Sequence, residues 1–233
     1  MKGFWEFETS NKECIHEILP DGLFDLIFEI KNDRVSEISL TGVWIQQIQV
    51  SIPKNTKLIG VRFKLISAEY IFKQSIRELN NTKTKLPKAF LGAENLPFRN
   101  FEDFSSSLIQ KIQYGLKNLK EIDDRKFELF KILYEQKGEI TVKELSERIF
   151  WSSRQINRYF NDRFGFPLKT FCNILKCHSS FPHIANGQLF PEKAYYDQAH
   201  FIKEVRRFTG ATPKDLFHNK NDRFLQLSTL SEY

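Results

Sequence analysis

Two short sets of polar residues have the types and the spacing that reading DNA bases requires. The first set contains Arg154, Asn157 and Arg158, and the second contains His200 and Lys203. Residues three or four positions apart lie on one face of an α-helix, so each set presents its side chains together. Arg and Lys can bond guanine, and Asn can bond adenine, in the major groove. The spacing therefore predicts two helices that contact base edges.

An internal repeat contains both sets. Residues 152–165 align without a gap with residues 197–210, at an offset of 45 positions. A fixed offset of this kind indicates a duplicated structural unit. Ser152 and Asp197 begin the two copies and are helix N-cap types, whereas Gly165 and Gly210 close them and are a helix-ending type. We therefore expect helices at 153–164 and 198–208.

Each copy has one apolar and one polar face at helical spacing. The side chains predicted to point inward are Ile156, Tyr159, Phe160, Phe164, Phe201, Val205 and Phe208. The side chains predicted to face DNA are Ser153, Arg154, Asn157, Arg158, Asn161, Gln198, Ala199, His200, Lys203 and Arg206. A single helix of this kind is more often an ordinary solvated surface helix. Two matched copies favour DNA binding.

The residues before the first copy predict a helix-turn-helix unit. Thr141 and Glu144 have the spacing of a capping box, and Leu145 and Ile149 form an inward pair. A short break at residues 150–151 then leads to the next helix. In a helix-turn-helix unit the second helix enters the major groove.

With this repeat and the helix-turn-helix unit before it, roughly the last 80 to 90 residues resemble the DNA-binding region of AraC-type transcription regulators. The resemblance implies two helix-turn-helix units joined by a linker helix and a sequence-specific regulator that binds double-stranded DNA. RNA polymerase is a further partner if the protein activates. Pro182 predicts an interrupted linker helix, and Pro191 predicts only a short first helix in the second unit. The alternative is a ligand-binding or protein-interaction module whose degenerate second unit no longer binds DNA.

The first hundred residues predict a mainly antiparallel β domain of barrel or sandwich type. The expected strands are residues 3–8, 23–30, 35–40, 43–52 and 58–65. Pro20, Asp21, Gly22 and Asp25, with residues 60–63, resemble an N-terminal domain often fused to AraC-type regions. That resemblance implies effector sensing or dimerisation.

Three charged residues of this domain are candidates for contact with a small-molecule effector. They are Asp21, Asp25 and Arg62. The favoured alternative is structural, with Asp21 in a turn and Arg62 paired with a carboxylate.

The chain divides into an α+β arrangement of four parts. These are a β-rich effector domain (1–100), a helical connector (101–136), an all-α double helix-turn-helix domain (137–218) and a polar tail (219–233). Phe104, Leu108, Ile112 and Leu116 form an apolar stripe in the connector. Such a stripe is usually intrachain core, and a homodimer seam is the alternative.

The net charge of +6 is concentrated in the predicted DNA-binding part. Residues 137–215 contain 13 basic and 8 acidic residues, which accounts for five of the six excess charges. A surface that faces phosphates needs such an excess. No apolar run approaches the ~20 residues that span a bilayer. The N-terminus lacks a signal pattern, because Glu6 and Glu8 interrupt it, so a cytoplasmic location is expected.

The residue types for catalysis or metal binding do not occur in recognisable patterns. The chain has no phosphate-binding glycine loop, nucleophile elbow or metal-binding helix motif, so no catalytic residue and no cofactor are predicted. Cys172, Cys177, His178 and His183 lie close in sequence and suggest a metal or redox sensor. Their spacing fits no usual zinc pattern, which favours buried free thiols and no metal.

Overall fold

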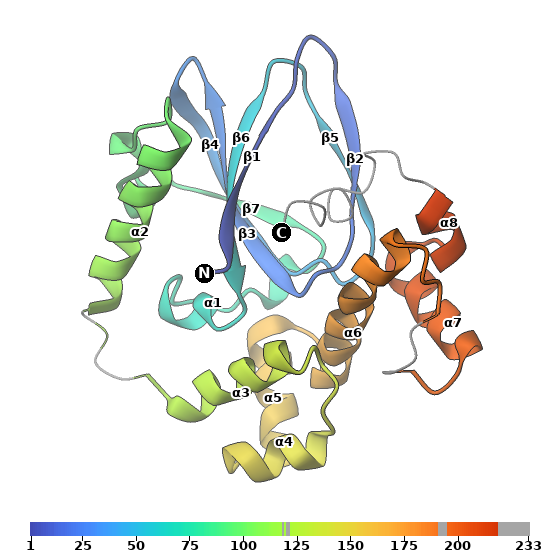
Figure 1. Ribbon diagram of the computed structural model, residues 1–233. Helices are drawn as coiled ribbons and strands as arrows, with labels where there is room; N and C mark the ends of the chain where they lie inside the picture. Colours follow the sequence, from blue (N-terminus) through green and yellow to red (C-terminus); the bar gives the residue numbers. More distant parts are fainter. Residues whose placement is uncertain (118, 120–121, 191–194, 219–233) are drawn as a thin grey trace.

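The computed structural model describes residues 1–117, 119, 122–190 and 195–218 of the 233-residue chain. Strands fill the first part of the chain, and helices follow them (Figure 1). The fold is α+β, with an antiparallel β domain and a helical C-terminal region, as predicted. The expected polar tail at 219–233 lies outside the described residues.

The β domain contains a five-stranded sheet and a two-stranded ribbon. The strands are β1 (Gly3–Glu8), β2 (Cys14–Ile18), β3 (Leu23–Lys31), β4 (Arg34–Thr41), β5 (Ile48–Ile52), β6 (Lys57–Lys64) and β7 (Lys83–Leu86). The sheet has the order β1-β6-β3-β4-β7, and β2 pairs with β5. All pairings are antiparallel. Short helical segments follow β6 and β7: α1 (Ser67–Tyr70), η1 (Arg77–Leu79) and η2 (Phe90–Asn95).

The prediction of a strand over residues 43–52 is wrong in its first half. The backbone amide of Ile45 donates to Asn81 Oδ1 at 2.9 Å, and the Val43 carbonyl accepts from the Asn81 amide at 3.1 Å. These backbone groups are therefore bonded to a loop residue, and the strand begins only at Ile48.

Helix α2 (Phe101–Lys117) covers the β domain at the left of Figure 1. Phe104, Leu108 and Ile112 are buried, and the Phe104 ring lies 5.2 Å from the Phe28 ring of β3. Leu116 is partly buried against the same core. The apolar stripe is therefore intrachain core, as its usual interpretation predicts.

The remaining helices form the C-terminal region. They are α3 (Asp124–Glu135), α4 (Val142–Ile149), α5 (Ser153–Phe164), α6 (Leu168–Ala185), α7 (Gln198–Thr209) and α8 (Pro213–His218). Leu129, Phe130 and Leu133 of α3 are buried against α4, α5 and α6, in a core that continues into the strands. None of the described helices is both long and apolar enough to cross a membrane.

Polar contacts join the helical region to the β domain. The Tyr134 hydroxyl of α3 donates to the Gly22 carbonyl at 2.9 Å and accepts from the Leu65 amide at 3.1 Å. A second core holds Leu19 of the β domain against α6 and α7, with Phe181 and Phe201 among its members. Both halves of the helical region are thus packed on the β domain.

Candidate nucleic-acid interface

Helices α4 and α5 form the predicted helix-turn-helix, and capping sets their limits. Thr141 and Glu144 make the capping box of α4. Phe150 ends α4 in the left-handed conformation, with φ of 55°, which turns the chain sharply. Ser152 then caps α5 through a second capping box with Gln155. The exposed Gln155 accepts from the Ser152 backbone amide through its Oε1 at 2.8 Å.

Helix α5 buries its apolar face and exposes its basic face. Ile156, Phe160 and Phe164 are almost fully buried, and Tyr159 is half-buried against the same core. The residues of the predicted DNA face that are exposed are Ser153, Arg154, Arg158 and Asn161. The two faces therefore lie as helical spacing predicts.

Asn157 is the half-buried member of the predicted DNA face. Its Nδ2 donates to the Ser153 carbonyl at 3.0 Å, and its Oδ1 accepts from the Leu168 amide at 3.3 Å. The second bond joins α5 to the first residue of α6. Asn157 therefore has a structural role in positioning α5, and its role in base reading stays a prediction.

The second copy of the repeat forms α7 in the same manner. Asp197 caps the helix by accepting from the His200 amide at 2.7 Å, and Gly210 ends it with φ of 70°. Phe201, Val205 and Phe208 are buried. The residues of its predicted DNA face are all exposed, namely Gln198, Ala199, His200, Lys203 and Arg206.

The two units differ in the segment before the exposed helix. Helix α4 precedes α5 in the first unit. Among the described residues between Ala185 and Gln198, none is helical. The expected short helix at Pro191 lies outside the described residues. The described part of the chain therefore gives α7 a partner in α6 but shows no first helix of its own unit.

The prediction that Pro182 interrupts the linker helix is wrong. Helix α6 runs without a break from Leu168 to Ala185 and includes Pro182. A proline inside a helix loses one backbone hydrogen bond and crowds the preceding turn. Here Pro182 lies only three residues from the end of the helix, and the Asn186 amide still bonds its carbonyl. Packing of Phe181 and Ile184 in the second core holds this last turn in place.

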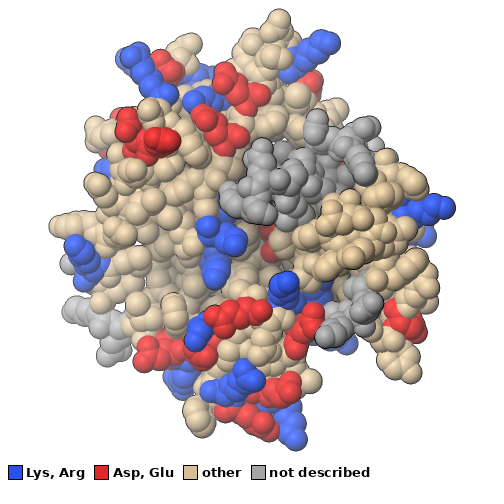
Figure 2. All heavy atoms as spheres, in the orientation of Figure 1, with Lys and Arg blue, Asp and Glu red and all other residues tan. Residues whose placement is uncertain are grey.

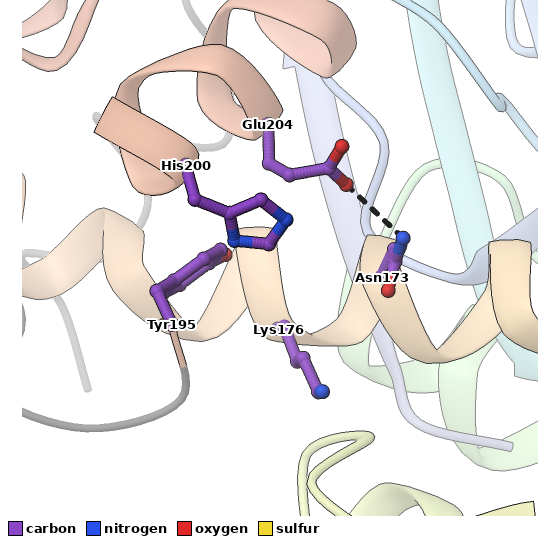
Figure 3. Close-up of a pocket in the computed structure, with 5 residues that line it drawn as sticks. All are labelled: Asn173, Lys176, Tyr195, His200 and Glu204. Carbon is purple, nitrogen blue, oxygen red and sulfur yellow. Dashed lines mark hydrogen bonds between the residues drawn. The ribbon is translucent and has the colours of Figure 1, made fainter. Parts of the chain in front are cut away.

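A small cavity lined by residues with polar groups lies between α6 and α7 (Figure 3). Asn173 and Lys176 line it from one side, and Tyr195, His200 and Glu204 line it from the other. Its volume is about 30 Å³, which suits a single water molecule. Asn173 Nδ2 donates to Glu204 Oε2 at 3.0 Å. This contact fixes the register of α7 on α6, and no local pattern in the sequence indicated it.

The three effector candidates come together in the β domain. Asp25 and Arg62 are direct partners in the β3–β6 register. Arg62 lies 3.1 Å from Asp21 Oδ2 and 3.4 Å from Asp25 Oδ1, and Trp5 Nε1 also donates to Asp25 at 3.2 Å. Burial raises the pKa of Asp25, and the Arg62 charge opposes that rise. The arrangement fits the structural alternative, and a role in effector binding remains untested.

The cysteines of α6 are buried free thiols. Burial raises the pKa of Cys172 to about 11 and raises the pKa of Cys177 further. A thiol is reactive and binds metals as the thiolate, so burial opposes both roles. Within the described residues, no group of three or more His, Cys, Asp and Glu side chains is placed to hold a metal ion.

Charge on the visible surface is mixed. Figure 2 shows basic and acidic side chains next to each other over the lower helices, α3 and α4. Helix α5 lies behind them in this orientation. The visible face therefore has the character of a solvated surface, and the case for DNA binding depends on the outward faces of α5 and α7.

Comparison with known proteins gives two likenesses. Residues 1–85 match the family described as domain of unknown function DUF6597, over less than half of the chain. The structure of ToxT from Vibrio cholerae is similar over 94% of this chain and 100% of its own, with 13% identity and a TM-score of 0.47. The curated proteins include no match. The function therefore has to follow from the residues of this chain.

Proposed function

We propose that the protein is a sequence-specific DNA-binding transcription regulator of AraC type. Helices α5 and α7 enter successive major grooves on one face of the duplex, about 34 Å apart. The observation that supports this proposal most directly is the repeated unit of N-cap residue, helix and left-handed glycine. Both copies of the unit expose basic side chains. The resemblance of both parts of the sequence to AraC-type proteins supports the same function.

In this proposal the two helices read bases and their surroundings bind the backbone. Arg154 and Arg158 on α5, and Lys203 on α7, are long exposed cations suited to guanine. Ser152, at the start of α5, is exposed and lies where backbone contacts set the register on phosphates. The β domain senses an effector or supports dimerisation, and the protein works in the cytoplasm.

The test is the substitution Arg158→Ala in the full chain. We expect a loss of about 1–3 kcal/mol at one base position of the site, with relaxed specificity there, because a bidentate base contact is removed. Binding to a library of site variants measures this loss. Lys203→Ala is the matched change in the second unit and should relax a different position. An equal loss for every DNA sequence would reduce Arg158 to a phosphate contact.

One observation favours a second candidate, a ligand-binding or interaction module without specific DNA binding. The described residues give α7 no preceding helix of its own unit. Salt dependence separates the two functions, because neutralising several phosphates makes log K fall steeply with log salt. A flat salt dependence, together with no effect of either substitution, would favour the module.

A further inference from the structure

A cleft beside the first exposed helix is not explained by base reading. It lies between the start of α3 and the outer side of α5, and its volume is about 320 Å³. Arg125 lines it from α3, Trp151 from the turn before α5, and Arg158 and Arg163 from α5 itself. A volume of this size holds a chemical group far larger than a water molecule.

The charges of the cleft are unbalanced toward the positive. Three guanidinium groups line it, and Asp162 is the carboxylate among its lining residues. Arg125 is paired with Asp123, with Nη2 to Oδ2 at 3.0 Å. Within the described parts of the chain, neither Arg158 nor Arg163 forms an ion pair. Unpaired cations in a concave site focus a positive potential on whatever enters it.

The wall of the cleft is preorganised. The Arg125 guanidinium lies over the Trp151 ring at 5.2 Å, and the Trp151 ring meets the Tyr159 ring edge-on at 5.5 Å. The Tyr159 hydroxyl donates to Glu69 Oε2 at 3.0 Å. Because a guanidinium already lies over the indole ring, that face of the ring is covered by a cation. The cleft is therefore suited to an anion and poorly suited to a planar apolar ring.

The rim at Arg163 is held by the β domain. The Arg163 carbonyl accepts from Ser75 Oγ at 2.9 Å and from the Ile76 amide at 3.0 Å. These bonds fix the backbone at Arg163 and leave its guanidinium available to the cleft. Binding therefore has to order the Arg163 side chain but not its backbone.

We propose that this cleft binds a backbone phosphate of the DNA that α5 reads, an inference that rests on the proposed function. A guanidinium matches a phosphate with two parallel hydrogen bonds. Arg158 belongs both to the cleft and to the exposed face of α5, so the cleft lies at the flank of that face. Phosphates border the major groove on both sides of an inserted helix. A free phosphate ester offers the same chemistry, and the shared position of Arg158 favours the DNA backbone.

The experiment uses Arg163→Gln in the full chain, with Arg34→Gln as the matched control. Arg34 is an exposed arginine at the start of β4, in the β domain. For Arg163→Gln we expect about a tenfold loss of affinity, equal for all DNA sequences, because one charge-assisted contact is lost. The slope of log K against log salt should fall by about one. Arg163→Lys should restore the slope but not the full affinity, and Arg34→Gln should change neither.

Neutral methylphosphonate linkages identify the phosphate. Each phosphate of the site is replaced in turn by such a linkage. Replacement at one position should weaken DNA binding by the wild type and leave DNA binding by Arg163→Gln unchanged. An unchanged salt slope in Arg163→Gln would overturn the proposal that the cleft binds a phosphate. Equal losses of affinity at every linkage in both proteins would do the same. In either case, wild-type footprints on DNA would still support the proposed function. Wild-type protein without sequence-dependent binding would instead remove the proposed function. If inorganic phosphate binds at the cleft and Arg163→Gln leaves DNA affinity unchanged, the cleft binds a free phosphate ligand. That result would overturn the proposal that the phosphate belongs to the DNA backbone.

Discussion

His178 is a titratable residue of α6 whose charged neighbours belong to the β domain. Asp21, Arg62 and Lys2 act on it electrostatically. Burial is the largest influence and lowers the pKa of His178, whereas Asp21 opposes that change. The folded protein therefore favours the neutral imidazole. A depressed folded pKa gives a contribution to stability that is present above the unfolded pKa of about 6.5 and is lost as pH falls.

We predict that His178→Gln makes the protein less sensitive to acid. Between pH 7.5 and pH 5.5 the wild type should lose thermal stability, and the variant should lose less, because the neutral amide has no proton to take up. Thermal unfolding at both pH values measures the difference. His183→Gln is a control, since His183 is an exposed residue of the same helix. Identical acid losses in wild type and His178→Gln would show that His178 does not contribute.

At the scale of the element, the two glycines that end α5 and α7 occupy equivalent positions but meet different neighbours. Both have left-handed φ, 77° at Gly165 and 70° at Gly210. A Cβ at Gly165 would lie 2.8 Å from the Arg77 carbonyl oxygen, which is backbone. A Cβ at Gly210 would meet the end of the Gln47 side chain, which is flexible.

We predict that Gly165→Ala destabilises the protein more than Gly210→Ala. Each alanine costs about 1–2 kcal/mol for its left-handed conformation. Gly165→Ala adds the displacement of the segment around Arg77, because a backbone atom cannot move without its neighbours. Urea unfolding of the two variants gives the comparison. Equal losses of unfolding free energy would mean that the backbone at Arg77 moves away from the added Cβ at little energetic cost.

The same elements show why part of the structure could be predicted from sequence. Caps at Ser152 and Asp197 and the inward faces of α5 and α7 follow from local rules, because a helix limit and a helix face depend on neighbouring residues. Strands β2 and β7 were not expected. Lys83–Leu86 has three polar residues in a row and no apolar alternation, so its strand conformation follows from pairing with β4. The tolerance of Pro182 was also missed, because tertiary packing of the last turn decides it.

The candidate site also has a part that could be predicted from the sequence and a part that could not. The exposed side chains of the predicted DNA face could be predicted because, in each copy, they share one helix face. The cleft of Arg125 and Arg163 could not, because packing of α3 on α5 brings together residues that are distant in sequence. Asp21, Asp25 and Arg62 were predicted as candidates, with Arg62 paired with an unspecified carboxylate, and only the β3–β6 register identifies Asp25 as its cross-strand partner.

At the scale of the whole molecule, the β domain holds the C-terminal end of α5. Ser75 Oγ donates to the Asp162 carbonyl at 3.0 Å as well as to Arg163, and Asn80 Nδ2 donates to the Phe164 carbonyl at 2.7 Å. The last carbonyls of a helix have no partner within the helix. A segment of the other domain supplies that partner here. The orientation of α5 is thereby coupled to the β domain.

We predict that the double variant Ser75→Ala, Asn80→Ala loosens this attachment without unfolding either part. The variant removes the Ser75 hydroxyl donor, which the Asp162 and Arg163 carbonyls share, and the Asn80 amide donor. At about 1 kcal/mol for each donor, the Ile76 amide, which bonds the Arg163 carbonyl, should exchange its hydrogen roughly 30 times faster. Amides in the β3–β6 pairing serve as the internal control and should keep their exchange rates. Faster exchange there as well would indicate general destabilisation. Unchanged exchange at Ile76 would mean that apolar packing alone holds α5 on the β domain, and the side chains of Ser75 and Asn80 would then have no part in the coupling.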